Sequence, residues 1–169
     1  MSSPEILCAS LRRVIRAARS TTAPSAVLDK ANRLAEELAA LLEPHEHPGP
    51  YHQGGLGERA ASDAGFQVRD PASMFPYSPI IGPRNPIAPP IELQVKDRAV
   101  HAETSFAPQY TGPPGSVHGG VIALVLDELL GYVNLANATG GYTGMLTIRY
   151  RALTPIEPVC EPPTKLMRQ

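Results

Sequence analysis

The stretch GPPGSVHGGVIALVLDELLG, residues 112–131, decides the fold of this chain. It opens with glycines and prolines that are typical of a loop, and it passes through a His-Gly-Gly triplet into an apolar run that contains Asp127 and Glu128. A nearly all-apolar segment over 121–136 predicts a helix that is buried on all sides. We therefore expect Asp127 to lie in or beside the core, and Glu128, about 100° further round the helix, to reach towards the surface.

The acid and the two glycines before it each allow two interpretations. A carboxylate in an apolar core needs either a structural partner or a chemical role, because an unpaired buried charge is costly. Gly119 and Gly120 form either a tight turn or a site where unpaired N–H groups at a helix N-terminus hold a phosphate or polarise a carbonyl oxygen. Such an oxyanion hole and Asp127 would together suit acyl transfer, with the acid attacking an acyl carbon or deprotonating a water.

The spacing of these groups bears on assembly. Gly120 and Asp127 are seven positions apart, which is about 10 Å along a helix axis. One carbonyl does not easily reach both from the same helix, so we expect the N-terminus of one helix to face the middle of a symmetry-related helix. This arrangement predicts a two-fold dimer with its sites at the interface.

Two helices are expected before this region. Residues 4–19 and 25–43 carry apolar side chains at helical spacing, and Ser25 can cap the second helix. Both helices are expected to dock on a neighbour rather than on a membrane, because the basic face is modest. The apolar stripe of the second helix consists of Ala31, Leu34, Leu38, Leu41 and Leu42.

The segment that follows, residues 44–77, is rich in proline, glycine and histidine and predicts a linker. A metal site on its histidines is conceivable, but no cysteine or acidic cluster completes a ligand set, which favours a solvated linker. The histidines concerned are His45, His47 and His52.

Strands are predicted on both sides of the central helix. Residues 91–106 alternate between apolar and polar side chains around a turn at 96–98, which predicts an antiparallel hairpin with His101 on its solvent-exposed face. Residues 142–152 alternate in the same way and predict another strand.

The composition excludes several classes of protein. The chain has 169 residues, of which 43% are hydrophobic and 18% charged, and this balance suits a globular domain. A net charge of −1 and 5% aromatic residues offer nothing that recruits nucleic acid or an anionic membrane. Cys8 and Cys160 form neither a disulfide framework nor a zinc site. The arginine-rich N-terminus is not expected to be a secretory signal. No apolar run approaches the roughly 20 residues of a bilayer span. We expect a cytoplasmic, reduced protein without a metal or a cofactor.

The segment HGGVIALVLDELLG, residues 118–131, resembles the His-Gly-Gly, six residues, Asp-Glu signature of hotdog-fold thioesterases, in the phenylacetate-pathway-type and thioesterase-superfamily-member branch. The segments GPRNP (82–86), YTGPPGSV (110–117) and TGMLTIRYRALTPI (143–156) resemble the same branch, so the resemblance covers about residues 78–156. It implies an α+β hotdog fold, in which an antiparallel sheet wraps around a long buried helix. It also implies an enzyme of lipid metabolism that hydrolyses acyl-CoA thioesters at the interface of a homodimer or a dimer of dimers.

The resemblance implies catalytic roles at matching positions only. Asp127 would be the nucleophile or the general base, and Gly120, together with Gly119, would supply the oxyanion N–H groups. His118 would shape the loop or contact the thioester region. Thr143 matches a threonine that assists catalysis in part of the family.

Three further positions match more weakly. Asn85 would position a water. Arg149 and Arg151 are candidates for binding the CoA phosphates, although solvated strand charges are the commoner role of such side chains.

The resemblance also divides the chain into parts: a helical segment at 1–43, a linker at 44–77, a partial hotdog domain at 78–156 and a Pro-rich tail at 157–169. Domains of this family usually continue with further strands after the Thr-Pro-Ile triplet, so we expect a sheet that is incomplete at its C-terminal strands and a weakened activity. Two alternatives stay open. One is a non-catalytic hotdog chain that acts at most as a binding or interaction module. The other is a hotdog hydratase or dehydratase, which would need a His–Asp, His–Asn or His–Glu constellation on the helix that is not evident.

Overall fold

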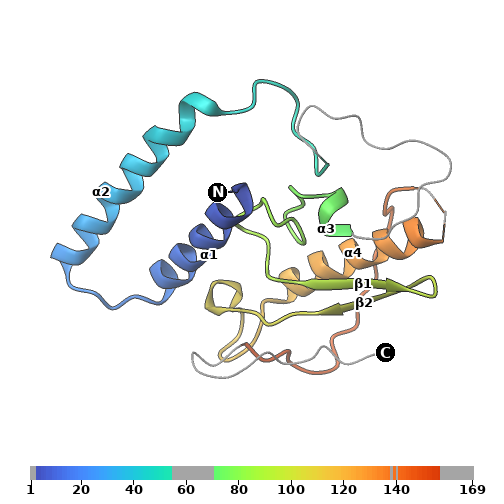
Figure 1. Ribbon diagram of the computed structural model, residues 1–169. Coiled ribbons are helices and arrows are strands. Elements are labelled where there is room, and N and C mark those ends of the chain that lie inside the picture. The colour runs from blue at the N-terminus through green and yellow to red at the C-terminus, as the bar shows by residue number, and fades with distance from the viewer. Residues whose placement is uncertain (1–2, 55–70, 138, 140, 157–169) are drawn as a thin grey trace.

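The structure is built around one apolar helix that lies alongside a two-stranded hairpin, with two further helices forming an N-terminal arm (Figure 1). The computed structural model describes residues 3–54, 71–137, 139 and 141–156. In chain order the elements are α1 (Pro4–Ser20), α2 (Ser25–Leu42), η1 (Glu43–His45), α3 (Pro71–Met74), β1 (Glu92–Lys96), β2 (Ala99–Glu103), η2 (Pro108–Tyr110) and α4 (Gly119–Ala136).

The hairpin β1–β2 is confirmed, with its turn where the sequence predicts it. Asp97 and Arg98 have φ values of 51° and 64°, the left-handed pair that a two-residue hairpin turn requires. In the antiparallel register Val95 pairs with Val100, and both are half-buried. His101 lies on the exposed face, as predicted.

The core lies between this hairpin, the loop before it and one face of α4. Within it the rings of Phe75 and Tyr132 meet edge to face, with their centroids 5.7 Å apart. Hairpin side chains such as Leu93 and Val95 pack against the core from one side. Its buried members are Ile80, Ile81, Phe106, Val117, Val125 and Tyr132.

The predicted apolar helix is confirmed as α4, but the prediction that it is buried on all sides is wrong for the part of the chain that the structure describes. Val125 and Tyr132 are buried, with 4% and 3% of their surface exposed, whereas Leu124 and Leu130 on other faces of the helix are 56% and 47% exposed. The physical reason is that a two-stranded sheet covers a single face of a helix.

The predicted strand at 142–152 is also not present. The segment passes α4 in an extended path, and Tyr142 and Met145 are almost fully exposed. Alternation shows what a strand could bury, but a strand forms only where a neighbour takes its backbone hydrogen bonds. In the described residues such bonds begin after this segment, where Thr154 O accepts from Val117 N at 2.9 Å and Ile156 N donates to Gly115 O at 3.0 Å.

By length and composition alone, α4 could also cross a membrane, and it is the one described helix that could. Its 18 residues have a mean hydropathy of 1.5, which corrects the expectation that no apolar run approaches a span. The core helix of a soluble protein meets the same criterion. Glu128, in the middle of α4, is hydrogen-bonded to Ser78, and this bond joins one face of the helix to the protein body.

The helix α1 docks on the body, as predicted. Ser3 caps its N-terminus, and Arg12 donates hydrogen bonds at 3.0–3.3 Å to four carbonyl oxygens of the loop 82–88. Glu5 and Arg84 form an ion pair beside this contact, and the Arg84 hydrogen bond lowers the pKa of Glu5 to about 2. Together these bonds join the N-terminal arm to the loop that precedes β1.

One expectation for α2 is wrong, and the surface on which the helix was expected to dock is not found in the described chain. Ser25 does not cap it: Pro24 occupies the cap position, no side chain supplies a cap hydrogen bond, and Ser25 is already the first helical residue. No residue of α2 is buried, and among the described elements the helix packs appreciably only against η1, the turn that follows it.

The histidines of the predicted linker do not form a cluster. In the described part of the chain no three His, Cys, Asp or Glu side chains approach closely enough to hold a metal ion. His47 instead makes an edge-to-face contact with Tyr51, with centroids 6.0 Å apart. The middle of the linker, residues 55–70, and Cys160 lie outside the described residues.

Candidate active site

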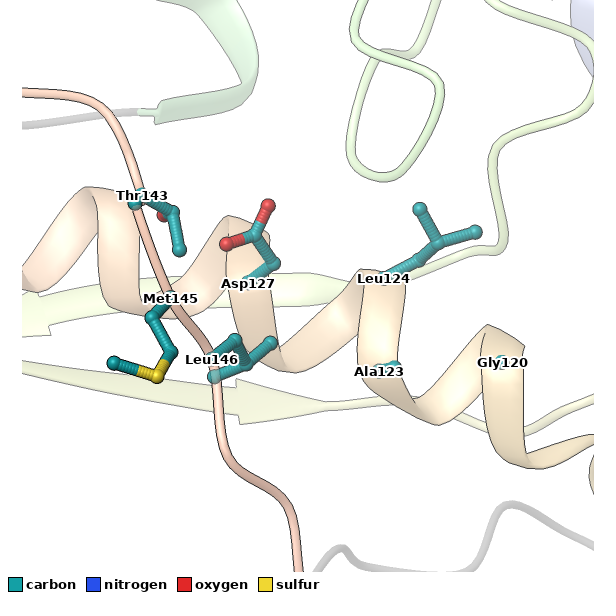
Figure 2. A pocket seen from close by; sticks show the side chains of 8 residues that line it. Gly120, Ala123, Leu124, Asp127, Thr143, Met145 and Leu146 are labelled. Atoms are coloured by element: carbon teal, nitrogen blue, oxygen red, sulfur yellow. The ribbon is translucent and has the colours of Figure 1, made fainter.

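An open pocket of about 440 Å³ lies against α4 (Figure 2). The segment after the helix crosses α4 and forms one wall of this pocket. The helix contributes residues three or four positions apart, which share one face of an α-helix. The lining residues are Gly120, Ala123, Leu124 and Asp127 from α4 and Thr143, Gly144, Met145 and Leu146 from the crossing segment.

Asp127 is the acidic residue of this pocket. Its Oδ1 atom is buried and has no hydrogen-bonding partner among the described residues. A buried carboxylate oxygen without a partner carries a desolvation penalty that a hydrogen bond would normally offset. The alternative of a structural acid bonded to a neighbour therefore finds no support at this atom.

The Gly120 N–H, the predicted oxyanion donor, has an acceptor within the chain. His118 is the N-cap of α4, and its Nδ1 accepts from Gly120 N at 3.0 Å. A Cβ on Gly120 would lie 3.1 Å from two atoms of the His118 ring, so the missing side chain allows this close cap. A substrate oxygen would have to replace His118 Nδ1 to receive this hydrogen bond.

The backbone carbonyl of Gly119 is held by a hydrogen bond from the segment after α4. This carbonyl oxygen accepts from Tyr150 Oη at 2.9 Å, which ties the crossing segment to the start of α4. His118 also donates its backbone N–H to Tyr110 O at 2.8 Å. Both contacts support the interpretation of the His-Gly-Gly triplet as a tight, hydrogen-bonded turn into the helix. The last residue of the triplet, Gly120, also lines the pocket.

A solved crystal structure described as that of a thioesterase superfamily protein matches this chain with a TM-score of 0.74 and 29% sequence identity. The match covers 92% of this chain and 71% of the other. The predicted resemblance to the thioesterase superfamily is confirmed. No family model and no curated protein matches the chain.

The structure brings together only some of the residues that the thioesterase resemblance implied for the active site. Gly120, Asp127 and Thr143 line one pocket, although they come from the beginning of α4, its middle and the segment after it. Arg149 and Arg151 are exposed and lie outside the pocket lining.

Asn85 is used in a loop away from the pocket lining. Its amide nitrogen donates to Tyr77 O at 3.0 Å, and its Oδ1 accepts from Ile87 N at 3.2 Å. Both ends of the side chain therefore shape the loop before β1, and this loop is also the docking site of α1.

Glu128 was expected to point towards the surface, and this expectation is wrong. Its Oε1 accepts from Ser78 Oγ at 2.5 Å and from Tyr132 Oη at 3.3 Å. Ser78 is fully buried, and burial together with the Glu128 charge raises the pKa of Tyr132. The spacing of Glu128 and Tyr132, four residues apart on one helix face, was a signal for part of this cluster. Nothing in the sequence pointed to Ser78.

The two adjacent acids of α4 therefore differ in their surroundings. Glu128 faces the protein body and is hydrogen-bonded there, while Asp127 faces the pocket. Gly120 and Asp127 line the same pocket within a single chain. The two-fold dimer expected from their spacing stays a prediction.

Proposed function

We propose that the chain is a thioester hydrolase that acts on acyl-CoA at the pocket beside α4. The observation that carries this proposal is the buried Asp127 Oδ1 without a partner, in a pocket that also contains Gly120 and Thr143. The similarity to a thioesterase superfamily protein supports the same reaction class.

In the proposed reaction the thioester carbonyl oxygen accepts the Gly120 N–H in place of His118 Nδ1, so the helix N-terminus stabilises the developing negative charge. Gly120 and Asp127 of one helix lie about 10 Å apart along its axis, so the Asp127 that reaches the same carbonyl is that of a second copy, as their spacing predicts. This Asp127 then acts in one of two ways. As a general base, it takes a proton from a water whose oxygen adds to the carbonyl carbon. As a nucleophile, it adds to that carbon itself and forms an anhydride that water cleaves. In both cases the C–S bond breaks, the thiolate of CoA leaves and is protonated, and a carboxylic acid is released.

The walls of the pocket suit an acyl group next to the reacting carbon. Ala123, Leu124, Met145 and Leu146 are apolar, and Leu124 and Met145 expose 56% and 86% of their surface. An acyl chain that covered them would remove apolar surface from water, which is favourable at about 25 cal/mol per Å². Arg149 and Arg151 continue the same segment and are the proposed partners of the CoA phosphates.

The primary test is the release of free thiol from acyl-CoA by the Asp127→Asn variant. This variant should lower kcat by about 100-fold or more and leave the fold intact, because it removes the base or nucleophile but keeps the side-chain shape. Near-normal turnover by a folded Asp127→Asn protein would reject the assignment. A single turnover in ¹⁸O-labelled water then tests the nucleophile route: when water adds to the Asp127 carbon of the anhydride, the label enters the Asp127 side chain, which the general-base route never labels.

A matched pair of threonines tests the position of the site. Thr143 lines the pocket, whereas Thr147 is exposed on the same segment beyond the lining. Thr143→Val should lower turnover and Thr147→Val should not.

Wild-type protein that is folded but releases no thiol would instead support a non-catalytic binding module, and hydration of an enoyl-CoA without thiol release would support a hydratase.

A further inference from the structure

The helix α2 leaves its apolar stripe uncovered within the described chain. Figure 1 shows the helix standing away from the core, and none of its residues is buried. An isolated helix of 18 residues is only marginally stable in water, so a helix with such a face needs a surface to bury it. The large side chains that are 40–66% exposed are Val27, Leu28, Leu34, Leu41 and Leu42.

The apolar positions of α2 repeat with the spacing of a helix that pairs with another helix. The residues of this seam are separated by four, three, four and three positions along the chain. That alternation is the a/d pattern of a coiled coil, in which each side chain packs between residues of a facing helix. The seam consists of Val27, Ala31, Leu34, Leu38 and Leu41.

The charged side chains beside the seam indicate that the facing helix is a second copy of α2. Lys30 and Glu37 are both exposed and occupy successive g positions, seven residues apart. In an antiparallel pair centred between Ala31 and Leu34, Ala31 of one helix lies opposite Leu34 of the other, and the g positions of the two helices face each other. Lys30 then faces Glu37 of a second copy, and Glu37 faces the second copy's Lys30.

A parallel pair would lose this complementarity, because g positions there face e positions. The e positions of α2 are all apolar and would leave both charges unmatched; they are Leu28, Ala35 and Leu42. In the antiparallel pair Leu28 of one helix instead faces Ala35 of the other and widens the apolar contact, while Leu42 lies beyond the paired stretch.

We propose that α2 is a self-association helix that pairs with α2 of a second copy of this chain, antiparallel and related by a two-fold axis. A two-fold interface requires one surface to be complementary to itself, and the order of Lys30 and Glu37 along one seam provides that property. An anionic membrane fits this helix less well. The f positions, furthest from the seam, are acidic at Asp29 and Glu36, whereas helices that lie on membranes carry basic residues there.

The experiment measures the molar mass of the full chain by light scattering after size exclusion, over a range of protein concentrations. Leu34→Glu places a charge beside the proposed two-fold axis, so the mass of the variant should be half that of the wild type at the same concentration. This comparison holds whether or not the chain also associates through another surface. Circular dichroism and thermal unfolding check that the body of the variant is folded.

Charge reversals test the register. Lys30→Glu or Glu37→Lys alone should weaken association by roughly tenfold, and the double variant Lys30→Glu/Glu37→Lys should restore it. A mixture of the two single variants should associate better than either alone, because each supplies the charges that the other lacks. Glu36→Lys is the matched control, since it makes the same charge change as Glu37→Lys at an f position that points away from the seam, and it should leave association unchanged.

Equal molar masses of the wild type and Leu34→Glu at all concentrations would overturn the proposal. So would a double reversal that fails to regain what the single reversals lose. Binding to anionic vesicles that Leu34→Glu abolishes, with no change in molar mass, would also overturn it and assign α2 to a membrane surface.

Discussion

The substitution Ser78→Ala removes one hydroxyl group, yet it should destabilise the protein strongly, because that hydroxyl makes several hydrogen bonds. Ser78 is fully buried, and its Oγ donates to Glu128 Oε1 at 2.5 Å. The same oxygen accepts from the backbone N–H groups of Ile80 at 3.1 Å and Ile81 at 3.2 Å. In the variant, two buried N–H groups and one carboxylate oxygen lose this partner.

The expected cost follows from those three groups. A buried donor or acceptor left without a partner costs about 1–3 kcal/mol. Glu128 keeps the Tyr132 hydroxyl and is only half-buried, so its share is small. We therefore expect the free energy of unfolding to fall by about 3 kcal/mol, which lowers the melting temperature by roughly 6–12 °C for a chain of this length.

The assay is urea-induced and thermal unfolding of the wild type and the variant at the same pH. Ser25→Ala is the control, because Ser25 is exposed and makes no cap hydrogen bond; it should change the free energy of unfolding by less than about 0.5 kcal/mol. A Ser78→Ala protein that also stays within about 0.5 kcal/mol of the wild type would refute the reasoning. The double variant Ser78→Ala/Glu128→Gln should cost less than the sum of the single variants, because the two residues share one bond.

The remaining predictions concern the entry to α4 and the N-terminal ion pair. Gly120→Ala brings a Cβ to 3.1 Å from the His118 ring and should lower turnover about tenfold or more, whereas Gly131→Ala, which meets nothing within 4 Å, should leave turnover unchanged in the same thiol-release assay. The pKa of Glu5 is lowered from 4.5 to about 2 by Arg84, so the pair stabilises the fold above pH 4.5, and this contribution is lost as the pH falls towards 2. Arg84→Met should therefore be less stable than the wild type at pH 6, and the two unfolding curves should converge near pH 2; a constant difference across this range would contradict the assignment.

The elements that the sequence predicted correctly are those specified by local pattern. The bounds of α1 and α2 follow from helical spacing and flanking prolines, and the hairpin follows from alternation around Asp97 and Arg98. Each of these signals lies within the helix or the hairpin that it predicts and needs no knowledge of distant contacts.

The predictions that were wrong depended on contacts between residues far apart in the chain. Alternation over 142–152 indicated a strand, but the strand needed a neighbour that α4 and the hairpin do not provide. The outward orientation of Glu128 was wrong because its partner Ser78 lies 50 residues away in the sequence. The stripe of α2 indicated that the helix requires a partner surface, without indicating that the described body does not supply one.

The difference between the two adjacent acids bears on which of them can do chemistry. Glu128 accepts from Ser78 and Tyr132, so it would have to give up those bonds, inside the protein, before it could take a proton or attack a carbon. Asp127 Oδ1 has no such partner to lose and faces the pocket. Because the two residues are consecutive on one helix, the bonds of Glu128 also fix the rotation of α4 and with it the direction of the Asp127 side chain. Loss of the Ser78–Glu128 bond should therefore lower turnover as well as stability, while loss of Asp127 should lower turnover alone.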